Sequence, residues 1–277
     1  MSCALHRHFF ETKDSVVMTS ATLAVGRSFD YVCRQLGLQP SAEAGRLKTV
    51  QLPAVFDYRK QALVLIPRDF PSVRGVSDNA FVRALADSLC RVALGTKGRM
   101  LILFTSYRML KQAYEYMQGP LAEHGVTLLG QGMDGTSRSK LLRLFQEQDT
   151  TVLLGTSSFW EGVDIPGDAL SCLAIVRLPF SPPNHPVMEA RTELVRMRKE
   201  NPFLQLSVPA AVIRFKQGFG RLVRTATDRG VVIIYDTRVI DTSYGKYFLQ
   251  SLPDPTVEQV PAGRLPERVE EWLNRGS

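Results

Sequence analysis

Short apolar runs alternate along the chain with segments in which hydrophobic residues recur at helical spacing. The apolar runs predict strands over 15–18, 48–55, 61–66, 100–104, 126–129, 152–154, 170–177 and 231–235. Helical spacing predicts helices over 28–36, 79–93, 107–117, 140–146, 186–199, 209–218 and 244–249. Apolar strands that alternate with helices are typical of a mainly parallel sheet covered by helices on both faces, so the predicted fold class is α/β.

Residues 217–224, Gln-Gly-Phe-Gly-Arg-Leu-Val-Arg, carry the most informative polar pattern. If this segment continues the helix before it, Arg221 and Arg224 share one face, because residues three apart are neighbours on a helix. Two guanidinium forks beside glycines that permit close approach suit a polyphosphate. The octet alone is equally compatible with a solvated basic helix end.

Two further polar segments follow predicted strands. Residues 154–167 place hydroxyl groups, an aromatic pair and two carboxylates directly after the strand 152–154. Ligands of open parallel sheets bind at the carboxyl ends of strands, so this loop suits either a sugar-phosphate backbone or a nucleotide. Ser20, Ala21 and Thr22 close the strand 15–18, a tripeptide that carries no signal by itself.

In this order and spacing, the segments resemble the second motor domain of superfamily 2 DNA helicases of the DinG/XPD type. Residues 20–22 resemble motif III, 104–107 motif IV, 159–164 motif V and 217–224 motif VI, and the resemblance extends from residue 15 to residue 251. It implies a RecA-like (P-loop NTPase-type) fold.

The chain lacks two motifs that this family carries in its first motor domain. It contains neither a P-loop, Gly-x-x-x-x-Gly-Lys-Ser/Thr, nor an Asp-Glu-Ala-His-like motif for magnesium. We therefore expect the C-terminal part of a larger ATP-dependent helicase, with ATP and Mg²⁺ held mainly by the absent first domain. The chain alone is expected not to hydrolyse ATP.

The resemblance assigns expected roles at the nucleotide. Arg221 and Arg224 are the candidate arginine fingers that neutralise the transferring phosphoryl group, and Gln217 orients the γ-phosphate or the attacking water. The expected nucleotide contacts are Glu161, Gly162, Asp164 and Gly220. An alternative role for the two carboxylates is to brace Arg221, and Asp236 and Arg238 are candidates for similar braces.

Single-stranded DNA is the expected partner, together with the N-terminal motor domain. The candidate nucleic-acid contacts are Thr105, Ser106, Gln131, Thr156, Ser157, Phe159 and Trp160. Hydroxyl and amide groups suit phosphate contacts, and either Phe159 or Trp160 stacks on a base or packs under the loop. Ser20, Ala21 and Thr22 are expected to couple the two motor domains.

The domain boundaries follow from these assignments. Residues 1–24 are read as a motif III strand and linker from the first motor domain, and that strand is expected to be poorly ordered or to pair at an edge. Residues 25–252 form the second RecA-like domain, and 253–277 a C-terminal tail rich in proline and charge. A helical insertion lies near 183–209, with Val187, Leu194 and Met197 expected to cover the core.

Composition adds modest constraints. A net charge of +7 and a pI near 9.4 favour a polyanionic partner. Four scattered cysteines predict no disulfide, zinc site or iron–sulfur cluster, and Cys33 and Cys90 are expected to fill the core. The chain shows no metal-ligand spacing, membrane-length apolar run or signal peptide, so a cytoplasmic protein is expected.

Two alternatives remain open at the level of sequence. One is a nucleic-acid-binding or regulatory module that never takes part in ATP turnover. The other is the non-catalytic partner of an upstream exonuclease domain, because some DinG-type proteins carry one ahead of the motor.

Overall fold

A seven-stranded sheet forms the centre of the computed structural model, which describes residues 2–72, 78–133, 135–160, 170–181 and 186–275. The strand order is β3-β4-β2-β5-β6-β1-β7, and every neighbouring pair is parallel. The strands are β1 (Ala62–Pro67), β2 (Met100–Leu103), β3 (Thr127–Gly130), β4 (Thr151–Gly155), β5 (Cys172–Ile175), β6 (Gly230–Ile234) and β7 (Thr256–Val260). The predicted α/β class is confirmed.

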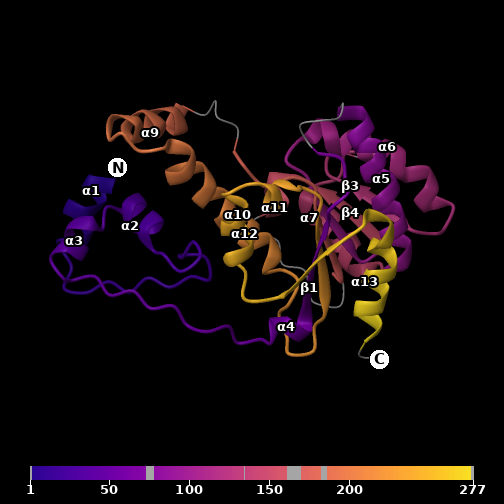
Figure 1. The fold of residues 1–277 in the computed structure, drawn as a ribbon, viewed down its shortest axis with the longest axis horizontal. Coiled ribbons are helices and arrows are strands. Elements are labelled where there is room, and N and C mark those ends of the chain that lie inside the picture. Colours follow the sequence, from indigo (N-terminus) through magenta and orange to yellow (C-terminus); the bar gives the residue numbers. More distant parts are fainter. Residues whose placement is uncertain (1, 73–77, 134, 161–169, 182–185, 276–277) are drawn as a thin grey trace.

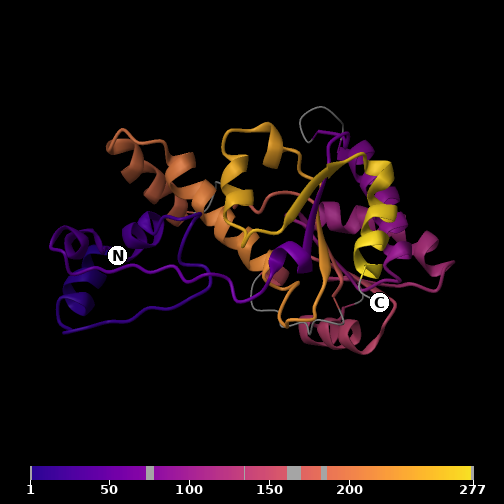
Figure 2. The same cartoon turned by 60° about the horizontal axis from the view of Figure 1, so that its bottom comes forward.

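Helices cover both faces of this sheet (Figure 1, Figure 2). Successive strand residues point to opposite faces, so Leu63 and Leu65 enter one core whereas Val64 and Ile66 enter the other. The first core is covered by α5 (Asp78–Gly95), α6 (Tyr107–Ala122) and α13 (Leu265–Asn274). The second is covered by α7 (Arg138–Glu147), α8 (Ser157–Trp160), α10 (Val208–Phe219), α11 (Arg238–Asp241) and α12 (Gly245–Gln250).

Local capping chemistry sets several helix ends. Ser106 is extended and its hydroxyl accepts a hydrogen bond from the Met109 amide, so Ser106 is the N-cap of α6. The N-cap of α7 is Ser137, whose hydroxyl accepts from the Lys140 amide. In the N-terminal segment, α2 (Asp30–Leu36) ends at Gly37, whose φ of 74° is readily adopted by glycine.

Residues 2–57 do not join the sheet. They contain α1 (Ser2–Leu5), a π-helix (His6–Phe10), α2 and α3 (Gln39–Glu43), and they lie to one side of the sheet, beside α9 (Pro186–Met197) (Figure 1, Figure 2). Arg34 of α2 donates to Glu200 at 2.8 Å and to Gln205 at 3.1 Å.

The strands predicted over 15–18 and 48–55 do not form, and the edge pairing expected as one outcome for 15–18 is not found among the described residues. Both stretches are irregular and carry exposed apolar side chains, among them Val17 at 86% and Val55 at 91%. A strand needs a neighbouring edge to pair its backbone groups, and neither stretch lies against one in the described part of the chain. The sheet begins only after α4 (Tyr58–Gln61), at Ala62.

The predicted C-terminal tail is also wrong. Strand β7 pairs in parallel with β1 and forms an edge of the sheet, and α13 packs against α5. Leu265, Val269 and Trp272 on α13 are buried in the first core. The helical spacing of Leu265, Val269 and Trp272 along α13 was the sequence signal that was overlooked.

The helical insertion corresponds to α9 and a π-helix (Phe203–Ser207) that precedes α10. Phe203 stacks on Phe180, with ring centroids 5.5 Å apart, and so joins the insertion to the loop after β5. The apolar side of α9 does not cover the core as expected, because Val187, Leu194 and Met197 are 52%, 58% and 71% exposed.

Candidate functional site

Three polar loops meet at the carboxyl end of the sheet, because β3, β4 and β2 are neighbours. Gln131 follows β3, Thr156 follows β4, and Thr105 follows β2 closely. The Gln131 side-chain oxygen accepts from the Thr156 amide at 2.8 Å and from its hydroxyl at 2.9 Å. The fold thus brings together two of the predicted nucleic-acid contacts, and Gln131 holds the loop after β4 in place.

The loop after β2 presents both backbone and side-chain groups to solvent. Thr105 is exposed, whereas Ser106 is half-buried and uses its hydroxyl as the α6 cap. Tyr107, which sequence reasoning passed over, is 48% exposed and donates its hydroxyl to the Gly132 carbonyl at 2.9 Å. Its position directly after Thr105 and Ser106 in the sequence could have identified Tyr107 as a further candidate site residue.

Phe159 and Trp160 lie in the second core, so neither presents a ring face for a base to stack on. They are 0% and 2% exposed. A Cβ at Gly155 would lie 2.5 Å from the Phe159 ring, which shows how closely the end of β4 approaches that side chain. The expectation that one of these rings stacks on a base is therefore wrong, since both rings pack in the second core. Ser157 belongs to α8 beside them.

The two motif VI arginines do not share a helical face. Helix α10 ends at Phe219, with Gly220 as its exposed C-cap, so Arg221 and Arg224 lie in the turns that follow. Arg221 is 5% exposed, and its Nη2 donates a hydrogen bond to the Trp160 carbonyl. The predicted motifs V and VI therefore meet through this bond.

A carboxylate holds the turn that carries Arg224. Asp228 accepts from the Arg224 amide at 2.8 Å and the Thr225 amide at 2.9 Å. Partial burial raises the pKa of Asp228, but bonds from Thr225 and Arg224 outweigh burial, and the pKa lies below its ordinary value. Gln61, at the amino end of β1, donates to the carbonyls of Thr225 and Asp228 at 2.8 and 3.0 Å. Sequence reasoning overlooked Gln61 and Asp228.

Gln217 lies on the last turn of α10 and is half-buried. Its side-chain oxygen is shielded from solvent and accepts no hydrogen bond from any described residue. An unsatisfied buried acceptor costs roughly 1–3 kcal/mol, and such groups call for an explanation such as a functional role. Glu161, Gly162 and Asp164 lie outside the described residues, as does any bracing of Arg221 by the two carboxylates.

The remaining candidates lie apart from this arrangement. Ser20, Ala21 and Thr22 lie in the N-terminal segment, where the Ser20 hydroxyl accepts from the Thr22 amide at 3.2 Å. The buried Asp236 pairs with the half-buried Arg238, but the pair braces the loop after β5 and not Arg221 as expected. The Asp236 carboxylate accepts from the Leu178 amide at 2.8 Å.

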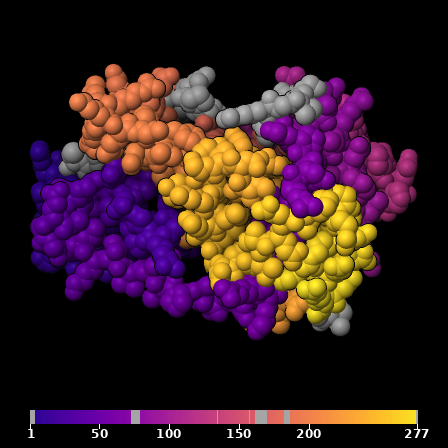
Figure 3. Space-filling model, viewed as in Figure 1, coloured from indigo at the N-terminus to yellow at the C-terminus, as the bar shows by residue number. Residues whose placement is uncertain are grey.

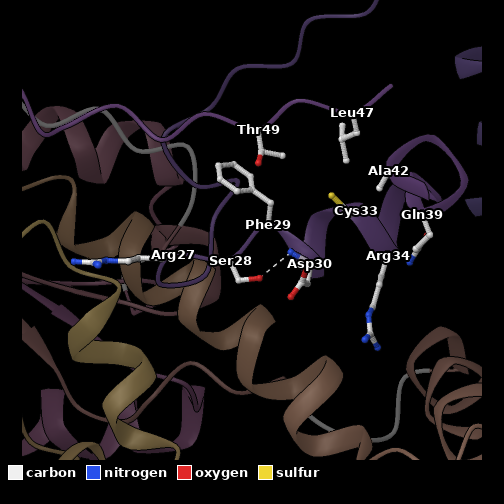
Figure 4. A pocket seen from close by; sticks show the side chains of 10 residues that line it. All are labelled: Arg27, Ser28, Phe29, Asp30, Cys33, Arg34, Gln39, Ala42, Leu47 and Thr49. Carbon is white, nitrogen blue, oxygen red and sulfur yellow. Dashed lines mark hydrogen bonds between the residues drawn. The ribbon is translucent and has the colours of Figure 1, made fainter. Parts of the chain in front are cut away.

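A hollow of about 700 Å³ lies in the N-terminal segment (Figure 4). Phe29 and Cys33 from around α2 line it, together with Leu47 and Thr49 from the irregular stretch beyond α3. None of the predicted site residues that the structure describes lines this hollow, so it lies apart from the described part of the candidate site.

The described residues add two observations on function class. Their histidine, cysteine and acidic side chains form no group of three or more that could hold a metal ion. None of their helices is both long enough and apolar enough to cross a membrane.

Cys90 and Cys172 are buried, and burial raises the pKa of their thiols to about 11 and about 12. Cys90 is thus a core residue as predicted, whereas Cys33 is only partly buried.

Residues 89–255, more than half of the chain, match the family model of the helicase C-terminal domain. The chain belongs to this family. Over 257 residues, the chain is 39% identical to the "3'-5' exonuclease DinG" of Bacillus subtilis, and the aligned region covers 93% of this chain and 27% of that relative. Over 245 residues, it is 41% identical to the "ATP-dependent DNA helicase YoaA" of Haemophilus influenzae, and the aligned region covers 88% of this chain and 36% of that relative. The chain thus spans about a third of the length of these relatives.

Solved structures agree on the fold. The helicase domain matches an XPD helicase with a TM-score of 0.56 at 17% identity, over 84% of this chain and 41% of that one. It matches Saccharomyces cerevisiae Dbp5 bound to RNA and ADP BeF3 with a TM-score of 0.53 at 18% identity. This match covers 89% of this chain and 54% of the Dbp5 chain. The RecA-like fold and the DinG/XPD-type helicase family predicted from sequence are confirmed.

Proposed function

We propose that this helicase domain is the C-terminal motor domain of an ATP-dependent DNA helicase. It closes over ATP bound by a separate P-loop domain and forms half of a track for single-stranded DNA. The main support for this proposal is the bond between Arg221 and the Trp160 carbonyl. This bond joins the segments of motifs V and VI that the family resemblance assigns to the nucleotide. The name of the YoaA relative supports ATP and DNA as substrates.

The phosphate-binding groups are supplied by the end of α10 and the turns after it. Arg221 and Arg224 neutralise the charge on the transferring phosphoryl group, and the buried oxygen of Gln217 orients the attacking water. A planar guanidinium fork binds phosphate oxygens in pairs, which a lysine ammonium cannot do. Mg²⁺ is held mainly by the P-loop domain, so the isolated helicase domain does not hydrolyse ATP.

The single-stranded DNA track follows the carboxyl ends of β3, β4 and β2. The Thr105 hydroxyl and the Ser157 amide bind backbone phosphates, which positions a strand without reading its sequence, whereas the donors of Thr156 are held by Gln131. Gln131 supports this loop through its two bonds to Thr156. Ser20 and Thr22 couple the track to the nucleotide through the contact between the two motor domains.

The decisive experiment measures ATP turnover, with single-stranded DNA, by an intact protein in which this chain follows its P-loop domain. Arg221→Ala and Arg224→Ala are each expected to lower kcat by about 10³-fold or more while DNA binding persists. Arg143→Ala is the matched control, because Arg143 is 66% exposed on α7 and pairs only loosely with Glu147 at 3.8 Å. Wild-type turnover by both motif VI variants would favour the regulatory module instead.

A split version of the protein tests the division of labour. Neither this chain nor the P-loop domain alone is expected to hydrolyse ATP, and mixing them is expected to restore turnover. ATP hydrolysis by this chain alone would disprove the proposed phosphate site.

A second candidate follows from the name of the Bacillus subtilis relative, an exonuclease. In that case this chain is the non-catalytic partner of a nuclease domain, since the described residues offer no acidic cluster for two-metal chemistry. Degradation of labelled DNA by this chain with Mg²⁺ or Mn²⁺ would contradict the non-catalytic role of this chain.

A further inference from the structure

Trp160 contacts three of the segments that carry the proposed chemistry. Its indole Nε1 lies 3.5 Å from the Phe104 carbonyl, which immediately precedes Thr105. Its ring packs against Gly218 on α10, where a Cβ would lie 3.1 Å from two ring carbons. Its own carbonyl accepts the bond from Arg221. One buried residue thus links the loop after β2, helix α8 and the turn after α10.

The bond to Arg221 fixes the geometry of that side chain. A guanidinium is planar and its N–H groups have fixed directions, so a bond to one carbonyl constrains the orientation of the whole fork. Trp160 is 2% exposed and Arg221 is 5% exposed. Because both partners are buried, neither can readily exchange this contact for water.

We propose that Trp160 is a positioning residue that holds Arg221 and ties its placement to the strand-binding loop after β2. A nucleic acid that displaces this loop moves the indole through Phe104, and the Trp160 carbonyl then moves Arg221. This role rests on the proposed function, because it requires Arg221 to act on a phosphate.

Gly218→Ala in the intact protein tests this role. The added methyl group meets the Trp160 ring at 3.1 Å, so the ring must shift by a few tenths of an ångström. We expect kcat for ATP to fall about tenfold with KM within about twofold, because a misplaced catalytic group loses transition-state stabilisation and not substrate binding. Gly119→Ala is the matched control, since Gly119 lies within α6 and has open space around it.

A double variant separates positioning from general damage. Because Trp160 acts through Arg221, Gly218→Ala is expected to lower the residual kcat of Arg221→Ala by less than about twofold. The Tm of Gly218→Ala is expected to lie within a few degrees of that of Gly119→Ala. Multiplicative losses in the double variant, or a collapse of Tm in Gly218→Ala alone, would overturn the positioning role.

Trp160→Phe tests the link to the loop after β2. It keeps an aromatic side chain and the carbonyl for Arg221 but removes the indole N–H that faces Phe104. Loss of one hydrogen bond is expected to reduce the maximal stimulation of turnover by single-stranded DNA about threefold, with DNA affinity within about twofold. Stimulation equal to wild type would overturn the link.

The variants distinguish this inference from the proposed function. If Arg221→Ala turns over ATP like wild type, the proposed function fails. If Arg221→Ala is slow while Gly218→Ala matches Gly119→Ala, only the positioning role of Trp160 fails.

Discussion

Asp236 and Arg238 form an ion pair at the end of β6, in which the Arg238 Nε donates to the completely buried Asp236 carboxylate at 2.8 Å. The same carboxylate accepts from the Leu178 amide, and the Arg238 guanidinium lies 5.6 Å from the centroid of the Phe180 ring. Since Phe180 also stacks on Phe203, this pair connects the sheet to the helical insertion.

Replacing Asp236 is expected to destabilise the chain strongly. Asp236→Asn leaves the Arg238 charge without its buried partner, so the free energy of unfolding in urea is expected to fall by about 3 kcal/mol. Asp254→Asn is the control, because Asp254 pairs with Arg59 at an exposed site with side chains 73% and 74% exposed. That variant is expected to lose less than about 1 kcal/mol. Equal losses in the two variants would contradict the structural role of the pair between Asp236 and Arg238.

The C-terminal helix α13 is expected to contribute as a core element. Leu265 is 0% exposed, so Leu265→Ala is expected to cost about 2–5 kcal/mol of unfolding free energy through lost burial and a cavity. Leu194→Ala on α9 removes the same atoms from a side chain that is 58% exposed, and little loss is expected. Indistinguishable urea midpoints for the two variants would support a detached tail instead.

Amide hydrogen exchange is expected to separate the N-terminal segment from the sheet. Residues 15–18 lie in no strand, whereas residues 231–234 belong to β6 between two neighbouring strands. Exchange at 15–18 is therefore expected to be at least about 10³-fold faster, after correction for intrinsic rates. Comparable protection in both stretches would show that 15–18 pairs with another edge.

The edge strand β7 contributes a pH-dependent interaction. Both oxygens of Glu258 accept from Arg268 at 2.7 Å, and these bonds hold the pKa of Glu258 below its ordinary value. A lowered folded-state pKa contributes stability that is complete above the unfolded value, about 4.3, and is lost as pH falls through the folded value.

Glu258→Gln is thus expected to lower the free energy of unfolding by about 0.5–1 kcal/mol at pH 7 and by less at pH 3. The loss at pH 7 is modest because Glu258 is 32% exposed. Urea unfolding at both pH values measures this difference. Glu267→Gln, in an exposed pair with Arg264, is the control and is expected to show little loss at either pH. A larger cost at acid pH than at neutral pH would contradict the assignment.

The core strands could be predicted because β1, β2, β4, β5 and β6 are buried along their whole length and leave near-continuous apolar runs. Their order could not, since pairing is decided by contacts between segments distant in sequence. The same limit explains 15–18, whose apolar run looks like a strand although no edge lies beside it in the described residues.

The candidate site divides along similar lines. The sequence determined which loops carry the polar groups, because parallel strands interrupted by helices bring loops such as those of Gln131 and Thr156 to one end of the sheet. Only the tertiary structure decided that Phe159 and Trp160 face the core and that Arg221 bonds to the Trp160 carbonyl after Gly220 ends α10. The physical reason is that residue types specify available chemistry, whereas packing between segments distant in sequence decides which side chains are buried.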